Sequence, residues 1–203
     1  MFAIKPDLKS FMKNSPVTVA IVTICLLITI VITILGGYTK SNLVLLGAYD
    51  KGLINNGELW RLLTYSFNHM SYPHFILNIV FLIYLSHPLE RALGRIKFIL
   101  SFIFTTIFAG IIIHLFSNVD YIAGSSGFGY GLLGMYIFLF LKYKNKFYQG
   151  DRKFIFIFVA IGFSVTFLIP DVSLAGHFGG FIGGIIFAAL LFREEKQVTF
   201  YMR

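Results

Sequence analysis

Two adjacent serines stand in a glycine-rich stretch of this chain, residues 124–134, which reads GSSGFGYGLLG and leads into an apolar run ending at Lys142. A helix that begins there offers unpaired backbone N–H groups and the positive end of its dipole. Both features stabilise the oxyanion that forms when a serine attacks a carbonyl group. The G-x-S-G pattern is weak by itself, because a glycine-rich chain supplies it by chance. The rest of the sequence must decide whether a serine reacts here.

Ser126, His74 and His177 each lie sixteen residues before the charged residue that ends their apolar run. Sixteen helical residues span about 24 Å, against a hydrocarbon core of about 30 Å. We therefore expect the three side chains at one depth, below the outer surface of a membrane. Asn78 lies one helical turn after His74 and shares its face. Polar groups at such a depth are costly unless they pair or line a cavity that holds water.

A serine beside a histidine is the minimum for nucleophilic catalysis, because the imidazole accepts the hydroxyl proton and returns it to the leaving group. The apolar runs carry no Asp or Glu at that depth, so a Ser126–His177 dyad is favoured over a triad. Tyr130 lies four residues after Ser126, and its ring is expected to stack on His177. Ser125 is expected to be a bystander.

Composition identifies a membrane protein. Of 203 residues, 57% are hydrophobic and 13% charged, with a mean hydropathy of +0.81. The net charge is +8, but the basic residues lie between apolar runs rather than in one patch, and this distribution does not favour a nucleic-acid partner. Cys25 is the single cysteine and excludes an intramolecular disulfide and a cysteine-based metal site. We expect no cofactor and no metal.

The hydropathy pattern predicts an all-α membrane protein with one domain over residues 1–203, including a short N-terminal segment, 1–15, and a tail, 193–203. Six spans are expected, at 17–35, 74–89, 96–116, 126–141, 154–169 and 177–192. Ser15 is expected to cap the first, with Pro16 as its first residue. Residues 38–72 form a partly submerged connection, with Trp60 and Tyr65 at headgroup level.

The basic residues set the expected orientation. Of 17 Lys and Arg residues, 14 fall in alternate segments that include both termini, and three fall in the other connections. The positive-inside rule then places both termini in the cytoplasm of a cell with the chain in its plasma or inner membrane.

Glycines predict close packing of the fourth and sixth spans. Small residues let helix backbones approach each other in lipid, where apolar burial gives no preference. One stripe consists of Gly127, Gly131 and Gly134, and the other of Gly176, Gly180 and Gly184.

These motifs together resemble the rhomboid family of intramembrane serine proteases. The family pattern matches at Gly124, Ser126, Gly127 and Tyr130, at His74 and Asn78, at His177, Gly180 and Gly184, at Trp60-Arg61, and at Glu90. A departure is Ser86-His87-Pro88, where the family more often has a glycine before the acidic residue. That departure predicts a kink at the inner end of the second span.

The resemblance implies a six-helix core and a Ser126–His177 dyad that cleaves single-span membrane proteins within or near their transmembrane segment. It implies an oxyanion hole formed by the Ser126 N–H with the side chains of His74 and Asn78. The implied partners are transmembrane substrates and the lipid bilayer.

Three other interpretations remain at this point. The chain could be a rhomboid-like protein that binds membrane clients without cutting them, or a transporter, although no inverted repeat is evident. Ser126 could also merely cap its helix. His69, His87 and His114 are interpreted as anchors at headgroup level. Cleavage of a single-span test substrate discriminates between the functions.

Overall fold

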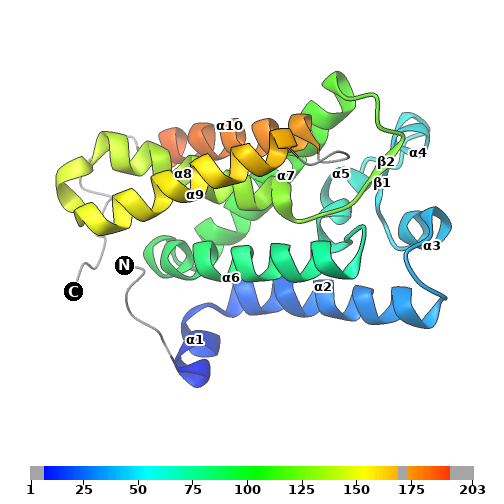
Figure 1. The fold of residues 1–203 in the computed structure, drawn as a ribbon, viewed down its shortest axis with the longest axis horizontal. Coiled ribbons are helices and arrows are strands. Elements are labelled where there is room, and N and C mark those ends of the chain that lie inside the picture. Colours follow the sequence, from blue (N-terminus) through cyan, green and yellow to red (C-terminus); the bar gives the residue numbers. More distant parts are fainter. Residues whose placement is uncertain (1–6, 169–172, 193–203) are drawn as a thin grey trace.

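The structure is a computed structural model that describes residues 7–168 and 173–192. Within these residues, six helices of 17 to 22 residues form a bundle (Figure 1). They are α2 (Pro16–Ile34), α6 (Tyr72–Leu93), α7 (Arg95–Phe116), α8 (Ser126–Lys142), α9 (Gln149–Leu168) and α10 (Leu174–Leu191). The fold is an all-α membrane bundle, as predicted.

Four of the described helices, α2, α6, α7 and α10, are both long and apolar enough to cross a membrane. Helix α8 is apolar but has 17 residues, and α9 is not among the four. The first five residues of α9 include Asp151, Arg152 and Lys153, which lower its hydropathy. The count of six spans therefore stays a prediction.

Short elements surround the six helices. Seven come from the connections and one, α1, precedes α2. They are α1 (Leu8–Asn14), α3 (Lys40–Leu45), β1 (Tyr49–Asp50), α4 (Lys51–Asn55), α5 (Arg61–Thr64), the 3-10 helices η1 (Tyr65–Phe67) and η2 (Lys144–Lys146), and β2 (Tyr121–Ile122). Strand β1 pairs antiparallel with β2, with Tyr49 opposite Ile122. This pairing ties the long first connection to the segment directly before α8 (Figure 1).

Arg61 organises the first connection. Its guanidinium is buried, donates to the carbonyls of Val44 and Ala48 at 2.7 and 2.8 Å, and pairs with Glu58. Trp60 is half exposed beside this guanidinium, which suits a headgroup-level position. The same expectation for Tyr65 is wrong. Its ring is buried and its hydroxyl donates to a backbone carbonyl of α7, because the connection folds back into the bundle.

Three of the predicted helices are too short at one end. Helix α6 continues through Pro88 to Leu93, so the proline does not end it, and Gly94 at φ 75° stops it. Helix α9 begins five residues early, at Gln149, and α10 begins at Leu174 because the Ser173 hydroxyl caps it. The predicted end of the fifth span at 169–171 and the tail at 193–203 lie outside the described residues.

Glu90 caps α2 from a neighbouring helix. Its carboxylate accepts from the backbone N–H groups of Val17 and Thr18 at 2.7 and 2.8 Å, and from the Thr18 hydroxyl at 2.6 Å. Pro16 has no N–H, so the first turn of α2 leaves no donor unpaired there. The prediction that Ser15 is the N-cap residue and Pro16 the first residue of α2 is confirmed, but the Ser15 side chain makes no capping bond, because its hydroxyl instead bonds His87 Nδ1 at 2.6 Å.

Helices α8 and α10 touch through their backbones. A Cβ atom built on Gly180 would overlap the carbonyl of Gly127, and one on Gly184 would overlap that of Gly131. The predicted close packing of the two glycine stripes is confirmed. Because residue numbers rise together along the contact, the two helices run parallel and their N-termini lie at the same end of the bundle.

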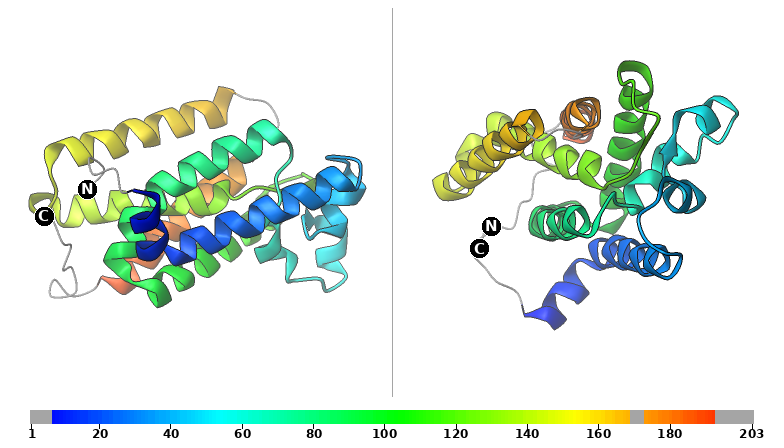
Figure 2. Two further views of the ribbon diagram at one scale, coloured as in Figure 1. Left: turned by 90° about the horizontal axis from the view of Figure 1, so that it is seen from below. Right: turned by 45° about the vertical axis from the view of Figure 1, so that its right-hand side comes forward.

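Helix α9 lies at the edge of the bundle in both views of Figure 2. Three of its twenty residues are buried, Asp151, Ile155 and Thr166, against twelve of seventeen in α8. Ring contacts join it to its neighbours: Phe158 stacks on Phe81 of α6 and Phe163 meets Tyr130 of α8. It is therefore the long helix with the fewest buried residues inside the described bundle.

Candidate active site

The predicted site residues gather where α6, α8 and α10 begin. Ser126 is the first residue of α8, His74 lies in the first turn of α6, and His177 lies in the first turn of α10. Phe81 of α6 lies against Gly129 of α8, and the Leu85 carbonyl accepts from the Tyr136 hydroxyl further along both helices, so α6 runs parallel to α8. Three helix N-termini thus face one region, as the shared depth of the three side chains predicts.

His177 is held on two sides. Its ring stacks on Tyr130 with centroids 4.0 Å apart and planes 13° apart, so the predicted stack is present. Its Nδ1 lies 2.7 Å from the Thr166 hydroxyl of α9. These contacts leave Nε2 as the ring nitrogen that can face Ser126. The first turns of the two helices meet at the Gly127 carbonyl, which Gly180 contacts one helical turn after His177.

Thr166 is the residue that sequence reasoning missed. A threonine in an apolar span is an ordinary packing residue, and nothing in its spacing relates it to a histidine eleven residues later. Here it is buried, at 3% exposure, and its hydroxyl touches both His177 and Tyr130. No sequence signal could have found it, because its contacts form only where α9 lies against α8 and α10.

Gly124 brings His74 and Ser126 together. A Cβ atom at Gly124 would lie 2.8 Å from His74 Cε1, 3.3 Å from His74 Nε2 and 3.7 Å from Ser126 Oγ. The position therefore requires glycine, and the imidazole and the hydroxyl both lie within 4 Å of one point. His74 Nδ1 accepts from the Met70 N–H at 3.3 Å, which leaves the ring proton on Nε2, the nitrogen that faces this point.

Asn78 is buried beside this point. Its Nδ2 donates one hydrogen to the His74 carbonyl at 2.9 Å, which leaves a second N–H. Its Oδ1 accepts from the Ser125 hydroxyl at 3.5 Å, and that hydroxyl also lies 3.2 Å from His69 Nε2. Ser125 was expected to be a bystander, yet its side chain is buried between His69 and Asn78. Ser126 is half-buried and more accessible than Ser125.

His69 is a buried loop residue. Its exposure is 0%, which contradicts an anchor at headgroup level. Burial, with His74 nearby, lowers the pKa of His69 to about 3, so its imidazole is neutral at ordinary pH. A neutral ring suits the site, because a positive charge beside Ser125 would have no acidic partner at that level of the described bundle.

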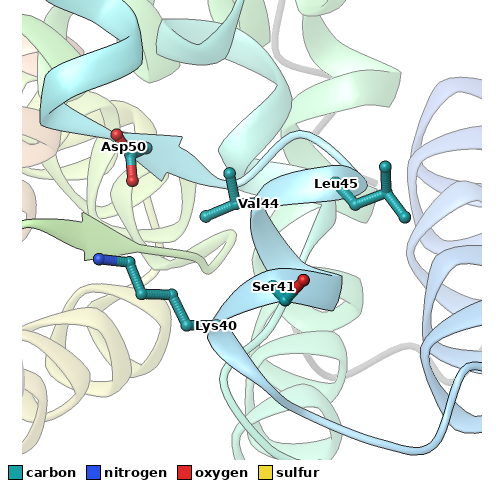
Figure 3. A pocket seen from close by; sticks show the side chains of 5 residues that line it. All are labelled: Lys40, Ser41, Val44, Leu45 and Asp50. Carbon is teal, nitrogen blue, oxygen red and sulfur yellow. The ribbon is translucent and has the colours of Figure 1, made fainter.

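The other two histidines lie away from the site. His87 bonds Ser15 and packs on Phe11 of α1, and His114 meets Tyr49 of β1. An open pocket lies between α3 and β1, lined by Lys40, Ser41, Val44, Leu45 and Asp50 (Figure 3). None of the predicted site residues lines this pocket, so it is not the place of the proposed chemistry.

No group of three or more His, Cys, Asp or Glu residues that could hold a metal ion occurs among the described residues. The side chains and backbone gathered here offer a serine at a helix N-terminus, a histidine held by a stack and a hydroxyl, and further N–H donors from His74 and Asn78.

Comparison with known proteins places this geometry in a family. The Rhomboid domain family matches residues 56–194. Rhomboid protease GluP of Bacillus subtilis (strain 168) is 30% identical over 189 residues, which cover 92% of this chain and 37% of GluP. Putative rhomboid protease YdcA of the same strain is 28% identical over 150 residues, 73% of this chain and 75% of YdcA.

Not every relative carries a protease name. Inactive rhomboid-related protein 2 of Caenorhabditis elegans is 26% identical over 153 residues, 71% of this chain and 44% of that protein. The chain thus spans less than half of GluP and of this inactive protein. The matched range includes the helices that carry His74, Ser126 and His177, and it covers more than half of the chain. The chain is a member of the rhomboid family.

Proposed function

We propose that this protein is an intramembrane serine endopeptidase that uses Ser126 as the nucleophile and His177 as the general base. The observation that carries the proposal is the immobilised imidazole of His177, stacked on Tyr130 and bonded at Nδ1, on the helix packed most tightly against the one that Ser126 begins. A base held in one orientation, with one nitrogen left for a serine, is what nucleophilic catalysis requires.

The reaction follows from these roles. Ser126 Oγ attacks the scissile carbonyl carbon while His177 Nε2 takes the hydroxyl proton. The tetrahedral intermediate collapses as His177 returns the proton to the leaving amine, and an acyl-enzyme remains on Ser126. Water then attacks the acyl carbon, again with His177 accepting the proton, and the new carboxyl terminus leaves.

The negative charge of the intermediate needs donors. Three donors come from this part of the protein: the Ser126 N–H at the start of α8, the His74 Nε2–H beside Gly124, and the second Asn78 N–H one turn after His74. We assign these three as the oxyanion hole. Loss of one such donor typically lowers turnover about 10²–10³-fold.

The substrate we propose is a single-span membrane protein, cut within or near its transmembrane segment. With both termini in the cytoplasm, as the basic residues indicate, the site opens toward the outer side of the membrane. We expect the substrate to approach from lipid beside α9, because that helix has the fewest buried residues of the six and faces α6 through Phe158 and Phe81.

The alternative is a silent member of the family that binds membrane clients without cutting them. One relative, from Caenorhabditis elegans, is named as inactive, which is why this alternative is considered. The presence of both Ser126 and His177, and the constrained geometry of the histidine, favour the protease. A silent member has no need for a histidine whose ring is immobilised by a stack and a hydrogen bond.

The test uses purified protein in lipid vesicles with a single-span substrate. Wild type should release fragments, Ser126→Ala and His177→Ala should release none, and Asn78→Ala should lower kcat about 10²–10³-fold. Ser125→Ala is the matched control. It keeps the nucleophile and should retain cleavage, lowered by about tenfold at most because Asn78 loses one contact.

Two outcomes would contradict the proposal. Cleavage that survives Ser126→Ala but not Ser125→Ala would assign the wrong serine. The silent member would be favoured if the wild-type protein binds several single-span substrates but is not modified by a serine-directed fluorophosphonate.

A further inference from the structure

The hydroxyl of Thr166 makes three short contacts at once. It lies 2.7 Å from His177 Nδ1 on α10, 2.7 Å from the Tyr130 hydroxyl on α8, and 2.8 Å from the Gly162 carbonyl one turn earlier on α9. The threonine side chain is buried at 3% exposure. One oxygen atom therefore joins the three helices that surround the proposed base.

The contacts fix where each proton lies. A hydroxyl has one hydrogen and two lone pairs, and a carbonyl only accepts. The hydrogen of Thr166 must therefore go to the Gly162 carbonyl. Its two lone pairs then accept from the Tyr130 O–H and from the Nδ1–H of His177. All three bonds coexist only in this arrangement.

We propose that Thr166 is a positioning residue that holds neutral His177 as its Nδ1–H tautomer and does so only while α9 stays packed against α8 and α10. The proposal rests on the catalytic role of His177 given above. A neutral imidazole carries one ring proton, so a proton on Nδ1 leaves the lone pair on Nε2 for the Ser126 hydroxyl. In the other tautomer Nε2 carries the proton and cannot accept another.

The contact depends on how closely α9 approaches. A Cβ atom at Gly162 would lie 3.0 Å from the Tyr130 hydroxyl, so the glycine permits the approach that brings Thr166 to His177. Apart from Thr166, Ile155 and Asp151 are the buried residues of α9, and ring contacts of Phe158 with α6 and of Phe163 with α8 join this helix to its neighbours. An outward shift of this end of α9 breaks the bond to Nδ1.

Access and chemistry are thereby coupled through one hydroxyl. If substrate enters beside α9, the helix is displaced and Thr166 no longer holds His177 as its Nδ1–H tautomer. The base regains its orientation only when α9 closes again over the bound segment. The open state, with α9 displaced, is then inactive toward water and toward loosely bound chains.

The test uses two Thr166 variants that separate the hydroxyl from the shape of the side chain. Thr166→Val replaces the hydroxyl with a methyl group, and Thr166→Ser keeps the hydroxyl and loses the methyl group. Nitrogen NMR of histidine-labelled protein in micelles reads the ring tautomer directly, with His177→Gln used to assign the signals. We expect a protonated Nδ1 in wild type and in the serine variant. We expect a mixture of tautomers, or a protonated Nε2, in the valine variant.

Kinetics give the second measurement. Thr166→Val should lower kcat on a spanning substrate about 10–100-fold with KM within about threefold of wild type, because the base is misoriented while the substrate surface is unchanged. Thr166→Ser should restore most of kcat. Thermal melts in micelles identify a variant that fails to fold, and in that case Tyr130→Phe, which removes one donor to the same hydroxyl, takes its place with a smaller expected loss.

The outcomes separate the two proposals. A protonated Nε2 in wild type, or a valine variant with wild-type spectrum and kcat, would overturn the role of Thr166. A wild-type protein with the expected spectrum but no cleavage would leave that role in place and contradict the proposed protease function.

Discussion

Replacing Glu90 with glutamine should loosen α2 from the bundle. The carboxylate is 1% exposed and accepts three hydrogen bonds, two of them from the backbone N–H groups that begin α2. A glutamine oxygen can keep the two bonds to Thr18, but its NH2 group then faces the Val17 N–H. One backbone donor is left without an acceptor, and the charge assistance of the others is lost.

Two effects oppose each other in this variant. Removing a buried charge is favourable by itself. Hydrogen bonds to charged groups contribute about 1.5–3 kcal/mol each, and an orphaned buried N–H costs about 1–3 kcal/mol. Because the carboxylate already has three donors and the positive end of the α2 dipole beside it, the lost bonds outweigh the relief. We expect a net destabilisation of about 2 kcal/mol, about a 30-fold change in an opening equilibrium.

Cys25 reports this opening. It is the single cysteine of the sequence, it lies in α2 at 0% exposure, and its thiol faces the Ser66 carbonyl. A maleimide dye labels it only when α2 separates from the bundle, so the labelling rate follows the opening equilibrium. Glu90→Gln in micelles should label about 30-fold faster than wild type.

The matched control is Glu58→Gln. Its carboxylate is partly exposed and pairs with Arg61 outside α2, so labelling of Cys25 should change less than threefold, an effect below about 1 kcal/mol. Equal labelling of wild type and Glu90→Gln, or equal acceleration by both variants, would refute the reasoning that the cap holds α2 in place.

Three further predictions follow from packing and charge. Gly184→Ala should lower the melting temperature and abolish cleavage, since the new methyl group overlaps a carbonyl of α8, whereas Gly150→Ala meets nothing within 4 Å and should leave both unchanged. Burial lowers the pKa of His69 to about 3, so as pH falls from about 6.5 the unfolded chain binds a proton before the folded chain does. Stability should therefore fall between pH 6.5 and 3, and His69→Gln should reduce that loss in thermal melts at stepped pH. Phe158→Ala should speed cleavage of spanning substrates because its ring meets α6, while Phe167→Ala, whose ring meets α10, should not; equal rates for wild type and Phe158→Ala would argue against access beside α9.

Much of the fold could be predicted because the membrane simplifies the pattern. Uncharged runs predicted the spans, and helix periodicity predicted that Tyr130 would stack on His177. The glycine stripes predicted the backbone contact of α8 and α10 because small residues have a direct steric meaning in lipid. These inferences need only local spacing.

The failures have a common physical cause, which is partners distant in sequence. Ser15 is a good helix cap by type, but Glu90, more than seventy residues away, takes that role and leaves the serine to His87. Tyr65 has the composition of a surface anchor, yet the connection folds its ring inward. Thr166 acquires its contacts only once α9 lies against α10, and no spacing rule encodes that approach.

The direct contact of α8 with α10 also restricts how this protein can change during evolution. Since no side chain separates Gly127 from Gly180 or Gly131 from Gly184, almost any replacement there moves a backbone that carries the proposed serine or histidine. The contact between α6 and α9 is instead made by aromatic rings such as Phe81 and Phe158, which can be exchanged for other apolar side chains at modest cost. Lineages that acquire new substrate preferences should therefore differ along α6 and α9, while the glycine contact between the other two helices stays the same.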